Sequence, residues 1–496
     1  MLLLLLSCSL GNYKQVGCEQ SSECLQAFGM GSTCGSDGFC EDITPHERCT
    51  KTIPADLFSS WDQHRDDLLI GMLFDFSTDE PNIAAVEMAI NDANEEGGLN
   101  GRSYGLIGCD YQNPSAAFPY TESLESPIVE VSQYLSTTLS IPVIVGPAGS
   151  SYSLQAYPVT EVLPSILISP SASSPELTSI DANHQKTNED PGLFWRTVGS
   201  DELQAATMAW QIKENNDSSI AFIYQNGSYG INFISELLQN LPTSLTTASN
   251  SFEFANRNQL SQLLTDAIDS NRTGIVFVSA DILDITEFMT LITTLIDEDD
   301  TGIYSNLHIY LADAAADEKL LALDINDQLP AQIYGTRPAL PTGNVFDLFR
   351  DNYNTTTGIQ AEQNVYAAYS FDATWLAIYG YAWAAAAEEP YSGTKIASGL
   401  RQLSNPAGPA IDLGIQWSTG RSYISSGQSI DITGASGNLD FDPQSEELFN
   451  PIEIFRLGKD NTEQCFYVTY QCTIQAEASA IDCSPAPVDN NCLSAE

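Results

Sequence analysis

The chain has 496 residues, of which 43% are hydrophobic, so it is long enough for two or three domains with sizeable cores. It carries 65 acidic and 18 basic residues, and the resulting formal net charge of -47 argues against nucleic acid as a partner. No long acidic block occurs, so this charge belongs to the surface of a globular protein, and such a surface suits a saline medium outside the cytoplasm.

The first residues, MLLLLLSC, form an apolar run that ends in Leu-Leu-Ser-Cys. This run resembles the lipoprotein box of bacterial lipoproteins, and the resemblance implies that Cys8 is acylated after cleavage. Residues 1–17 are then a signal and linker segment. No other stretch approaches the ~18 apolar residues of a membrane span, so the expected location is extracytoplasmic, in the periplasm or at the cell surface, with the lipid as the sole membrane anchor.

Ten further cysteines, an even number, permit five disulfide bonds. They cluster before residue 50 and after residue 464, with Cys109 between, which indicates disulfides and an oxidising compartment. A zinc site is the disfavoured alternative, because the sequence has no C-x-x-C pair and its four histidines are scattered. Residues 18–49 are therefore predicted to be a small disulfide module, and residues 471–496 a disulfide-tied C-terminal tail.

The main region begins with a buried strand over residues 68–74. A helix follows, in which Ile83, Val86, Ile90 and Ala93 recur at helical spacing, and a Gly-Gly pair ends it. Further strands are predicted over residues 104–109, 141–145 and 166–168, with a helix over 153–163 between the last two. This order of strand, helix and strand predicts a parallel sheet.

Small polar residues follow two of these strands, as Gly149-Ser150-Ser151 and as Ser171-Ala172-Ser173-Ser174. Their N–H groups and hydroxyls near a helix start suit a small anion, and neighbouring strand ends of an open α/β sheet form half of a cleft. The alternative is that the serines only cap helices and form turns.

The alternation of strands and helices restarts after about residue 197 and predicts a second doubly wound domain. The expected helices cover residues 204–215, 258–270 and 285–296, and the expected strands cover 220–224, 274–279 and 308–311. Two more helices are expected over residues 366–387 and 395–403, and the first of these is apolar except for Asp372.

Several phrases resemble the type I periplasmic binding proteins, in the leucine/isoleucine/valine-binding branch of the receptor ligand-binding region family: AINDANEEGGLNGR, VGPAGSS, ISPSASSPELT, FWRTVGSDELQ and the closing GNLDFD. The resemblance covers about residues 68–457. It implies an α/β fold with two doubly wound parallel-sheet lobes joined by a three-crossing hinge. Lobe 1 is expected over residues 66–196 and 338–430 and lobe 2 over 197–337 and 431–470, with the third crossing between residues 414 and 436.

A free amino acid offers a carboxylate and an ammonium, so its receptor needs N–H and hydroxyl donors on one side and a carboxylate on the other. Matched residue by residue, the resemblance implies that lobe 1 holds the ligand carboxylate through Ser150, Ser151, Ala172 and Ser173. It implies that lobe 2 holds the ammonium through Asp201, Tyr229 and Asp313.

The three lobe 2 residues also suit structural roles. Asp201 is well placed to cap the helix that follows, and Tyr229 to pack at a helix start. The match at Asp313 is weaker, because the family's usual glycine two residues earlier is Leu311.

The ligand side chain is expected near the loop after the first strand, at Phe74, Asp75, Phe76 and Ser77, and near Tyr152. Relatives that bind an acidic ligand use an arginine near this loop, and none occurs between residues 74 and 100. The missing arginine and the negative field disfavour glutamate, so a neutral amino acid is the expected ligand.

The resemblance implies a solute-binding protein that delivers its ligand to an ABC importer, without a cofactor. The alternative is a ligand-sensing module that signals through a partner protein, and a structural lipoprotein of the cell surface also stays open. An enzyme is disfavoured, because G-x-S-x-G, H-E-x-x-H and P-loop motifs are missing and four histidines leave little material for base catalysis.

Overall fold

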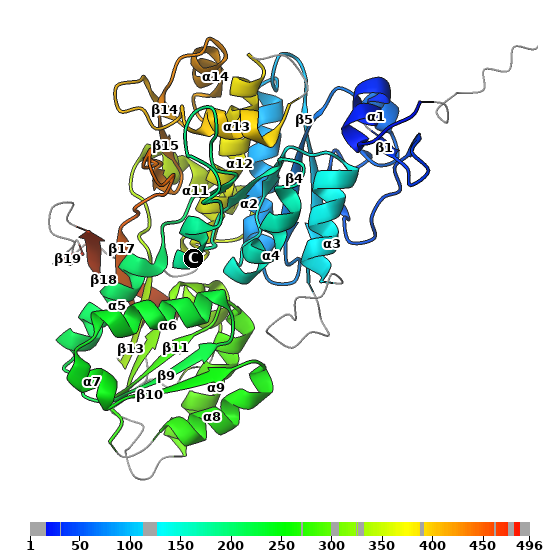
Figure 1. The fold of residues 1–496 in the computed structure, drawn as a ribbon. Coiled ribbons are helices and arrows are strands. Elements are labelled where there is room, and N and C mark those ends of the chain that lie inside the picture. The colour runs from blue at the N-terminus through cyan, green and yellow to red at the C-terminus, as the bar shows by residue number, and fades with distance from the viewer. Residues whose placement is uncertain are drawn as a thin grey trace, which may run out of the picture.

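The computed structural model describes residues 16–29, 31–112, 126–268, 271–298, 307–323, 325, 332–386, 391–460, 463–474 and 481–486. These residues form two α/β lobes, and a small N-terminal module lies beside the upper lobe in Figure 1. The predicted α/β class and the two-lobe arrangement are therefore confirmed. Cys8 and Cys492 lie outside the described residues, so the lipidation of Cys8 stays a prediction.

The N-terminal module contains α1 (Ser21–Phe28), β1 (Ser32–Cys34) and β2 (Cys40–Asp42). Two disulfides, Cys18–Cys34 and Cys24–Cys40, hold this small unit together, as its lack of large aliphatic residues requires. The module is also fixed to lobe 1. The strand β3 (Lys51–Ile53) pairs antiparallel with β5 of that lobe, and the Cys49–Cys109 disulfide joins the same two segments.

Lobe 1 is built on a six-stranded sheet in the order β3-β5-β4-β6-β7-β8, parallel except for β3. Its other strands are β4 (Leu68–Phe74), β5 (Tyr104–Asp110), β6 (Val143–Val145), β7 (Ile166–Ser169) and β8 (Phe194–Arg196). Two groups of helices pack on it: α3 (Pro127–Gln133) with α4 (Ser150–Thr160), and α2 (Glu80–Glu95) with α11 (Asn344–Thr357), α12 (Tyr366–Ala384) and α13 (Gly393–Leu400). All seven residues of β4 are buried, as expected for a strand covered on both faces.

Residues 431–448 belong to lobe 1, so their predicted place in lobe 2 is wrong. They follow α14 (Trp417–Ser425), and β15 (Asp431–Gly434) forms a small sheet with β14 (Ala410–Asp412) and β16 (Gly437–Asn438). The carboxylate of Asp372 on α12 accepts hydrogen bonds from the N–H groups of Ala435 at 2.8 Å and Ser436 at 2.7 Å, which ties this sheet to lobe 1. The third crossing therefore follows Leu448, which is still in the lobe 1 core, and not residues 414–436.

Lobe 2 has an eight-stranded sheet in the order β10-β9-β11-β12-β13-β17-β18-β19, of which the first five strands are parallel. Those five are β9 (Ile220–Gln225), β10 (Asn250–Phe254), β11 (Gly274–Val278), β12 (His308–Leu311) and β13 (Ile333–Pro338). The helices α5 (Asp201–Glu214), α6 (Ser228–Asn240) and α7 (Thr243–Thr247) cover one face (Figure 1). The other face carries α8 (Leu260–Ala267), α9 (Ile282–Asp297) and α10 (Glu318–Leu321).

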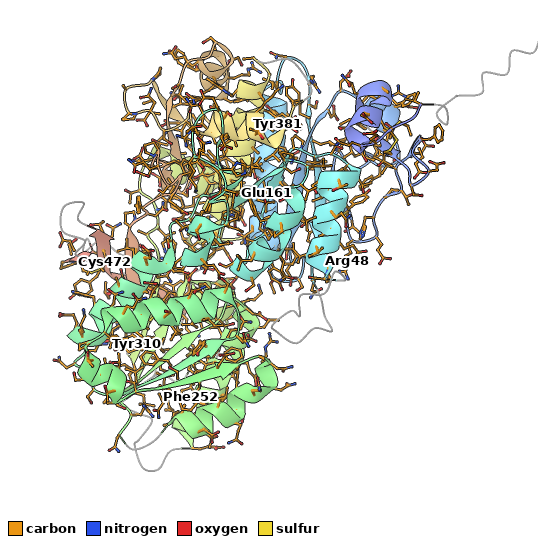
Figure 2. The ribbon with its side chains drawn as sticks, viewed as in Figure 1. Arg48, Glu161, Phe252, Tyr310, Tyr381 and Cys472 are labelled. Carbon is orange, nitrogen blue, oxygen red and sulfur yellow. A yellow bond between two sulfur atoms is a disulfide. The ribbon has the colours of Figure 1, made fainter. Side chains whose placement is uncertain are left out.

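The last three strands of this sheet, β17 (Ile452–Asp460), β18 (Glu463–Ile474) and β19 (Ile481–Pro485), are antiparallel. The Cys472–Cys483 disulfide joins β18 to β19, and Figure 2 shows Cys472 in these outer strands. Cys465 is also disulfide-bonded. The described part of the predicted C-terminal tail thus extends the lobe 2 sheet.

The chain passes between the lobes three times, after β8, after β13 and before β17. Arg196 at the end of β8 makes a buried two-point ion pair with Glu447, with Nε–Oε2 at 2.7 Å and Nη2–Oε1 at 2.9 Å. Because Glu447 stands just before the third crossing, this pair holds two of the three connections together. Among the described helices, none combines the length and apolarity that a membrane span requires.

Candidate functional site

A cavity of about 650 Å³ lies between the lobes, at the carboxyl ends of strands from both sheets. Its volume is within the range of small-molecule sites, roughly 300–1,000 Å³. Lobe 1 lines it with Asp75 after β4, residues 148–150 after β6 and Ser171 after β7. Lobe 2 lines it with Gln225 at the end of β9, residues 280–284 after β11 and Asp313 after β12.

On the lobe 1 side, the turn between β6 and α4 brings a helix start to the cavity wall. Gly146 in this turn has a φ of +100°, and a Cβ there would lie 2.3 Å from the Leu73 carbonyl oxygen, so the turn requires glycine. Gly149, Ser150 and Tyr152 then line the cavity. The first turn of a helix carries partial positive charge and N–H groups without intrahelical partners, which favours an anion at this wall.

Of the four lobe 1 residues predicted to bind the ligand carboxylate, Ser150 lines the cavity. The Ser151 hydroxyl accepts a hydrogen bond from the N–H of Ser228 across the lobes at 3.0 Å. The Ala172 N–H donates to the Ser169 hydroxyl at 3.0 Å, so it is engaged in this conformation. The Ser173 hydroxyl is buried and has no hydrogen-bond partner among the described residues. Their roles as ligand contacts stay predictions.

The lobes touch at one side of the cavity through a group that we call the interlobe latch: Ser151, Ser174 and Glu176 of lobe 1 with Ser228 and Asn232 at the start of α6. The Ser228 hydroxyl donates to Glu176 at 2.9 Å and also bonds the Ser174 hydroxyl at 3.0 Å. The Asn232 amide donates to the Ser174 hydroxyl at 3.1 Å. The structure therefore has its lobes in contact at this side.

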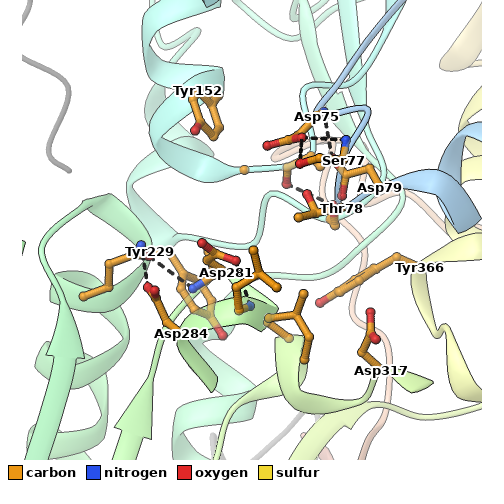
Figure 3. Close-up of a pocket in the computed structure, with 18 of the residues that line it drawn as sticks. Asp75, Ser77, Thr78, Asp79, Tyr152, Tyr229, Asp281, Asp284, Asp317 and Tyr366 are labelled. Carbon is orange, nitrogen blue, oxygen red and sulfur yellow. Dashed lines mark hydrogen bonds between the residues drawn. The ribbon is translucent and has the colours of Figure 1, made fainter. Parts of the chain in front are cut away.

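On the lobe 2 side, Asp313 is the centre of a buried polar cluster. The hydroxyls of Tyr229 and Tyr366, both labelled in Figure 3, donate to its carboxylate, and the Gln204 amide donates at 2.9 Å. Asp313 and Tyr229, which the sequence predicts as ammonium ligands, line the cavity, as does Tyr366, which it does not single out.

Asp201 lies behind this cluster and is 1% exposed. Neither of its carboxylate oxygens has a hydrogen-bond partner among the described residues. Burial raises the pKa of Asp201 well above its ordinary value, and the nearby Asp313 adds to this effect, while the Ser173 hydroxyl and the charge of Arg196 oppose it. The site is thus acidic and short of a positive charge, which an ammonium ion would supply.

Further carboxylates line the outer part of the cavity from both lobes, as Figure 3 shows for Asp75, Asp79, Asp281 and Asp317. Burial raises the pKa of Asp79 to about 7, and burial also raises the pKa of Asp75 and of Asp317. Of these four, the sequence placed only Asp75 at the cleft. Ser77 and Tyr152 also line it as expected, whereas Phe74 is buried in the lobe 1 core.

Among the described residues that line the cavity, no three His, Cys, Asp or Glu side chains cluster as metal ligands do. Among the described residues, the group of three or more His, Cys, Asp or Glu side chains with ligand atoms within 4.8 Å of one another is Cys18, Cys24 and Cys40. These cysteines are in the N-terminal module, and all three form disulfides.

The family model described as "receptor family ligand binding region" matches residues 83–451. No curated protein matches the chain. Among solved structures, the isoleucine complex of LivJ, the branched-chain amino acid transporter substrate-binding protein of Streptococcus pneumoniae, is 16% identical with a TM-score of 0.55, over 81% of this chain and 99% of that one.

Two further similar structures are bacterial binding proteins. A leucine complex of an ABC transporter substrate-binding protein from Desulfitobacterium hafniense is 17% identical, with a TM-score of 0.54 over 81% of this chain and 99% of that one. A 3,4-dihydroxybenzoic acid complex of an ABC transporter solute-binding protein from Rhodopseudomonas palustris is 13% identical, with a TM-score of 0.60 over 82% and 98%. These likenesses confirm the fold.

Proposed function

The chain belongs to the receptor family ligand binding region family, as the resemblance to type I periplasmic binding proteins predicted, and from this premise we propose that it captures an amino acid-like solute between its lobes for uptake by an ABC importer. One observation carries the proposal: the start of α4, whose first N–H groups have no partners within the helix, and the carboxylate of Asp313 line one cavity from the two lobes. The ligand carboxylate would meet Gly149 and Ser150 at the start of α4. Its ammonium would meet Asp313, with Asp201 behind it.

Capture would proceed by hinge closure. The ligand contacts groups from both lobes, so it binds the closed form more tightly than the open form and shifts the equilibrium between them. The interlobe latch would add hydrogen bonds to the closed form only. Closure also removes water from the cavity, which strengthens the attraction between the ammonium and the two aspartates.

The remaining parts of the proposal concern location and partner. An importer delivers solutes from outside the cytoplasm, and the disulfides of the module and of lobe 1 suit that oxidising environment. A lipid on Cys8 would hold the protein at the membrane. The alternative is that the protein senses a ligand and signals through a partner protein, as the receptor domains of the same family suggest. A deletion strain that loses a response to the ligand but keeps its uptake would favour this alternative.

Thermal unfolding in the presence of each common amino acid tests the proposal. A ligand at ~100 times its dissociation constant stabilises the folded protein by about 2.7 kcal/mol. We expect a shift with at least one amino acid and its loss in Ser173→Ala or Asp313→Ala. If no amino acid shifts the transition, the amino acid assignment is wrong.

A further inference from the structure

The cavity has a charge imbalance that an amino acid backbone alone does not balance. Among the described residues that line it, six are aspartates and one, Arg257, is basic. The aspartates are Asp75, Asp79, Asp281, Asp284, Asp313 and Asp317. Two of these already neutralise the arginine, since Arg257 donates to Asp281 at 2.6 Å and to Asp284 at 2.7 Å. The charge of Arg257 is therefore already balanced within lobe 2.

The other four aspartates, Asp75, Asp79, Asp313 and Asp317, form no ion pair with any Lys, Arg or His of the described residues. Their hydrogen bonds come from neutral donors. Asp75 accepts from the Ser77 N–H at 2.8 Å, Asp79 from the Asp75 N–H at 3.0 Å, and Asp317 from the Lys319 N–H at 2.7 Å. A carboxylate can accept about four hydrogen bonds, so each retains capacity for a ligand.

Like charges from the two lobes also face one another across the cavity. Asp281 of lobe 2 contributes to the raised pKa of Asp75 in lobe 1, although burial is the larger cause. At the same edge, Glu80 at the start of α2 and Glu318 at the start of α10 repel each other. Closure of the lobes brings these groups together, so their repulsion opposes the hydrogen bonds of the interlobe latch, and a positive charge between them would favour closure.

Resting on the proposed function, we propose that the cavity selects a ligand with a second positive charge, such as an amino acid with a basic side chain. The inner carboxylate of Asp313, with the buried Asp201 behind it, takes the α-ammonium. The outer carboxylates, Asp75 and Asp79 of lobe 1 and Asp317 of lobe 2, take the side-chain cation. The neutral amino acid expected from the sequence would bring no counter-charge to Asp75 and Asp79, and it would leave Lys319 as the positive charge near Asp317.

The surroundings favour an organic cation over a metal ion. The outer aspartates do not converge as a metal site requires, since no three of their oxygens lie within 4.8 Å of one another. Four tyrosines also line the cavity: Tyr111, Tyr152, Tyr229 and Tyr366. The rings of Tyr111 and Tyr152 lie 4.3 Å apart near the outer carboxylates, and aromatic faces attract ammonium and guanidinium groups.

Isothermal titration calorimetry on the purified protein tests the inference with arginine and citrulline, which match in shape but differ in side-chain charge. Lysine with norleucine forms a second such pair, and agmatine offers two cations without a carboxylate. We expect each basic amino acid to bind about tenfold or more tightly than its neutral partner. We also expect this preference to shrink in high salt, as a charge effect does.

The outcomes separate this inference from the proposed function. Neutral ligands that bind as tightly as basic ones overturn the inference and leave the proposed function standing. Agmatine binding without any amino acid binding overturns the amino acid assignment and supports the second charge. If none of these ligands binds, both proposals fail.

Single substitutions test which aspartates bind the side-chain cation of the ligand. Asp79→Asn and Asp317→Asn, one in each lobe, are each expected to weaken arginine binding about tenfold and to leave citrulline nearly unchanged. Asp266→Asn, at an exposed position on α8, is the matched control and should change neither. Equal losses for arginine and citrulline in both lobe variants would show that the aspartates act on structure and not on ligand charge.

Discussion

Replacing Asp201 by asparagine should make the ligand-free protein more stable and the ligand weaker. Asp201 is 1% exposed, and the neighbouring Ser173 hydroxyl and Arg196 charge offset its burial only in part, because the pKa of the carboxyl group stays well above its ordinary value. The shape of the side chain is kept in Asp201→Asn, while the charge is removed. If Asp201 serves binding at a cost in stability, the variant should be more stable and bind the ligand more weakly. If Asp201 only caps α5, the variant should be less stable.

The size of the effect follows from two opposing terms. A buried polar group without a partner costs about 1–3 kcal/mol, and a charged group costs more. Asp201 also stands in the first turn of α5, where a negative charge gains about 0.3–1 kcal/mol from the helix dipole. The balance predicts a net stabilisation of about 1–2 kcal/mol, or a Tm increase of roughly 2–8 °C for lobes of this size.

The dependence on pH gives a further check. The pKa of Asp201 is raised in the folded protein. The stability that its protonation contributes is therefore complete below about pH 4 and is lost as the pH rises through the folded-state pKa. Asparagine does not titrate. The stabilisation by Asp201→Asn should therefore be near zero at about pH 4 and largest at about pH 8.

Thermal unfolding across this pH range, with calorimetry for the ligand, measures both effects. Asp266→Asn on the surface of α8 again serves as the control and should change neither Tm nor affinity. A Tm that falls in Asp201→Asn at about pH 8, or an unchanged affinity, would refute the reasoning.

Three further predictions concern the rest of the fold. Burial raises the pKa of both Asp79 and Asp372 from 3.8 to about 7, so the stability that their protonation contributes is complete below about pH 4 and lost by about pH 7. Thermal scans should therefore give a higher Tm at about pH 5 than at about pH 8. The opposite trend would contradict this prediction. The Cys49–Cys109 disulfide spans 60 residues, which corresponds to about 4 kcal/mol of chain entropy. Denaturant unfolding of the Cys49→Ala/Cys109→Ala double variant should show a decrease of that order in the free energy of unfolding. A decrease below about 1 kcal/mol would contradict the prediction. Removing the side-chain hydrogen bonds of the interlobe latch with Ser228→Ala and Asn232→Ala leaves the bond from the Ser228 N–H to Ser151. The double variant should have a larger radius of gyration than the wild type in X-ray scattering of the ligand-free protein. An unchanged radius would mean that these side chains do not hold the lobes.

Local sequence patterns predicted β4 to β7 of lobe 1 and β9, β11 and β12 of lobe 2, and they missed the other strands of the lobe 2 sheet, including β10 and β13. The bounds of β4 match the prediction, because a run of seven buried residues between polar ends has no other reading. The helix α4 begins three residues before the predicted start, since serines favour turns in isolation but can occupy the first turn of a helix. The third crossing was misplaced because the contacts of Asp372 with Ala435 and Ser436 join residues far apart in the sequence.

The site was predictable only in part, for the same reason. Motif resemblance found Ser150, Tyr229 and Asp313, which line the cavity. The outer aspartates carry no local signal, because Asp79 and Asp317 are two acids among 65 and come together only when the lobes face each other. Phe74 was expected at the cleft, but it is the last residue of β4 and its side chain packs inward, while Asp75 after it turns toward the cavity.

The attachment of the N-terminal module determines which half of the molecule is free to move. The strand β3 and the Cys49–Cys109 disulfide fix the module to lobe 1, so the lipid proposed on Cys8 would hold lobe 1 and not lobe 2 at the membrane. With that anchor, opening and closing would move lobe 2 and its C-terminal strands relative to the membrane. A transporter or receptor that must distinguish the ligand-bound protein from the free one would recognise the position of lobe 2 relative to lobe 1.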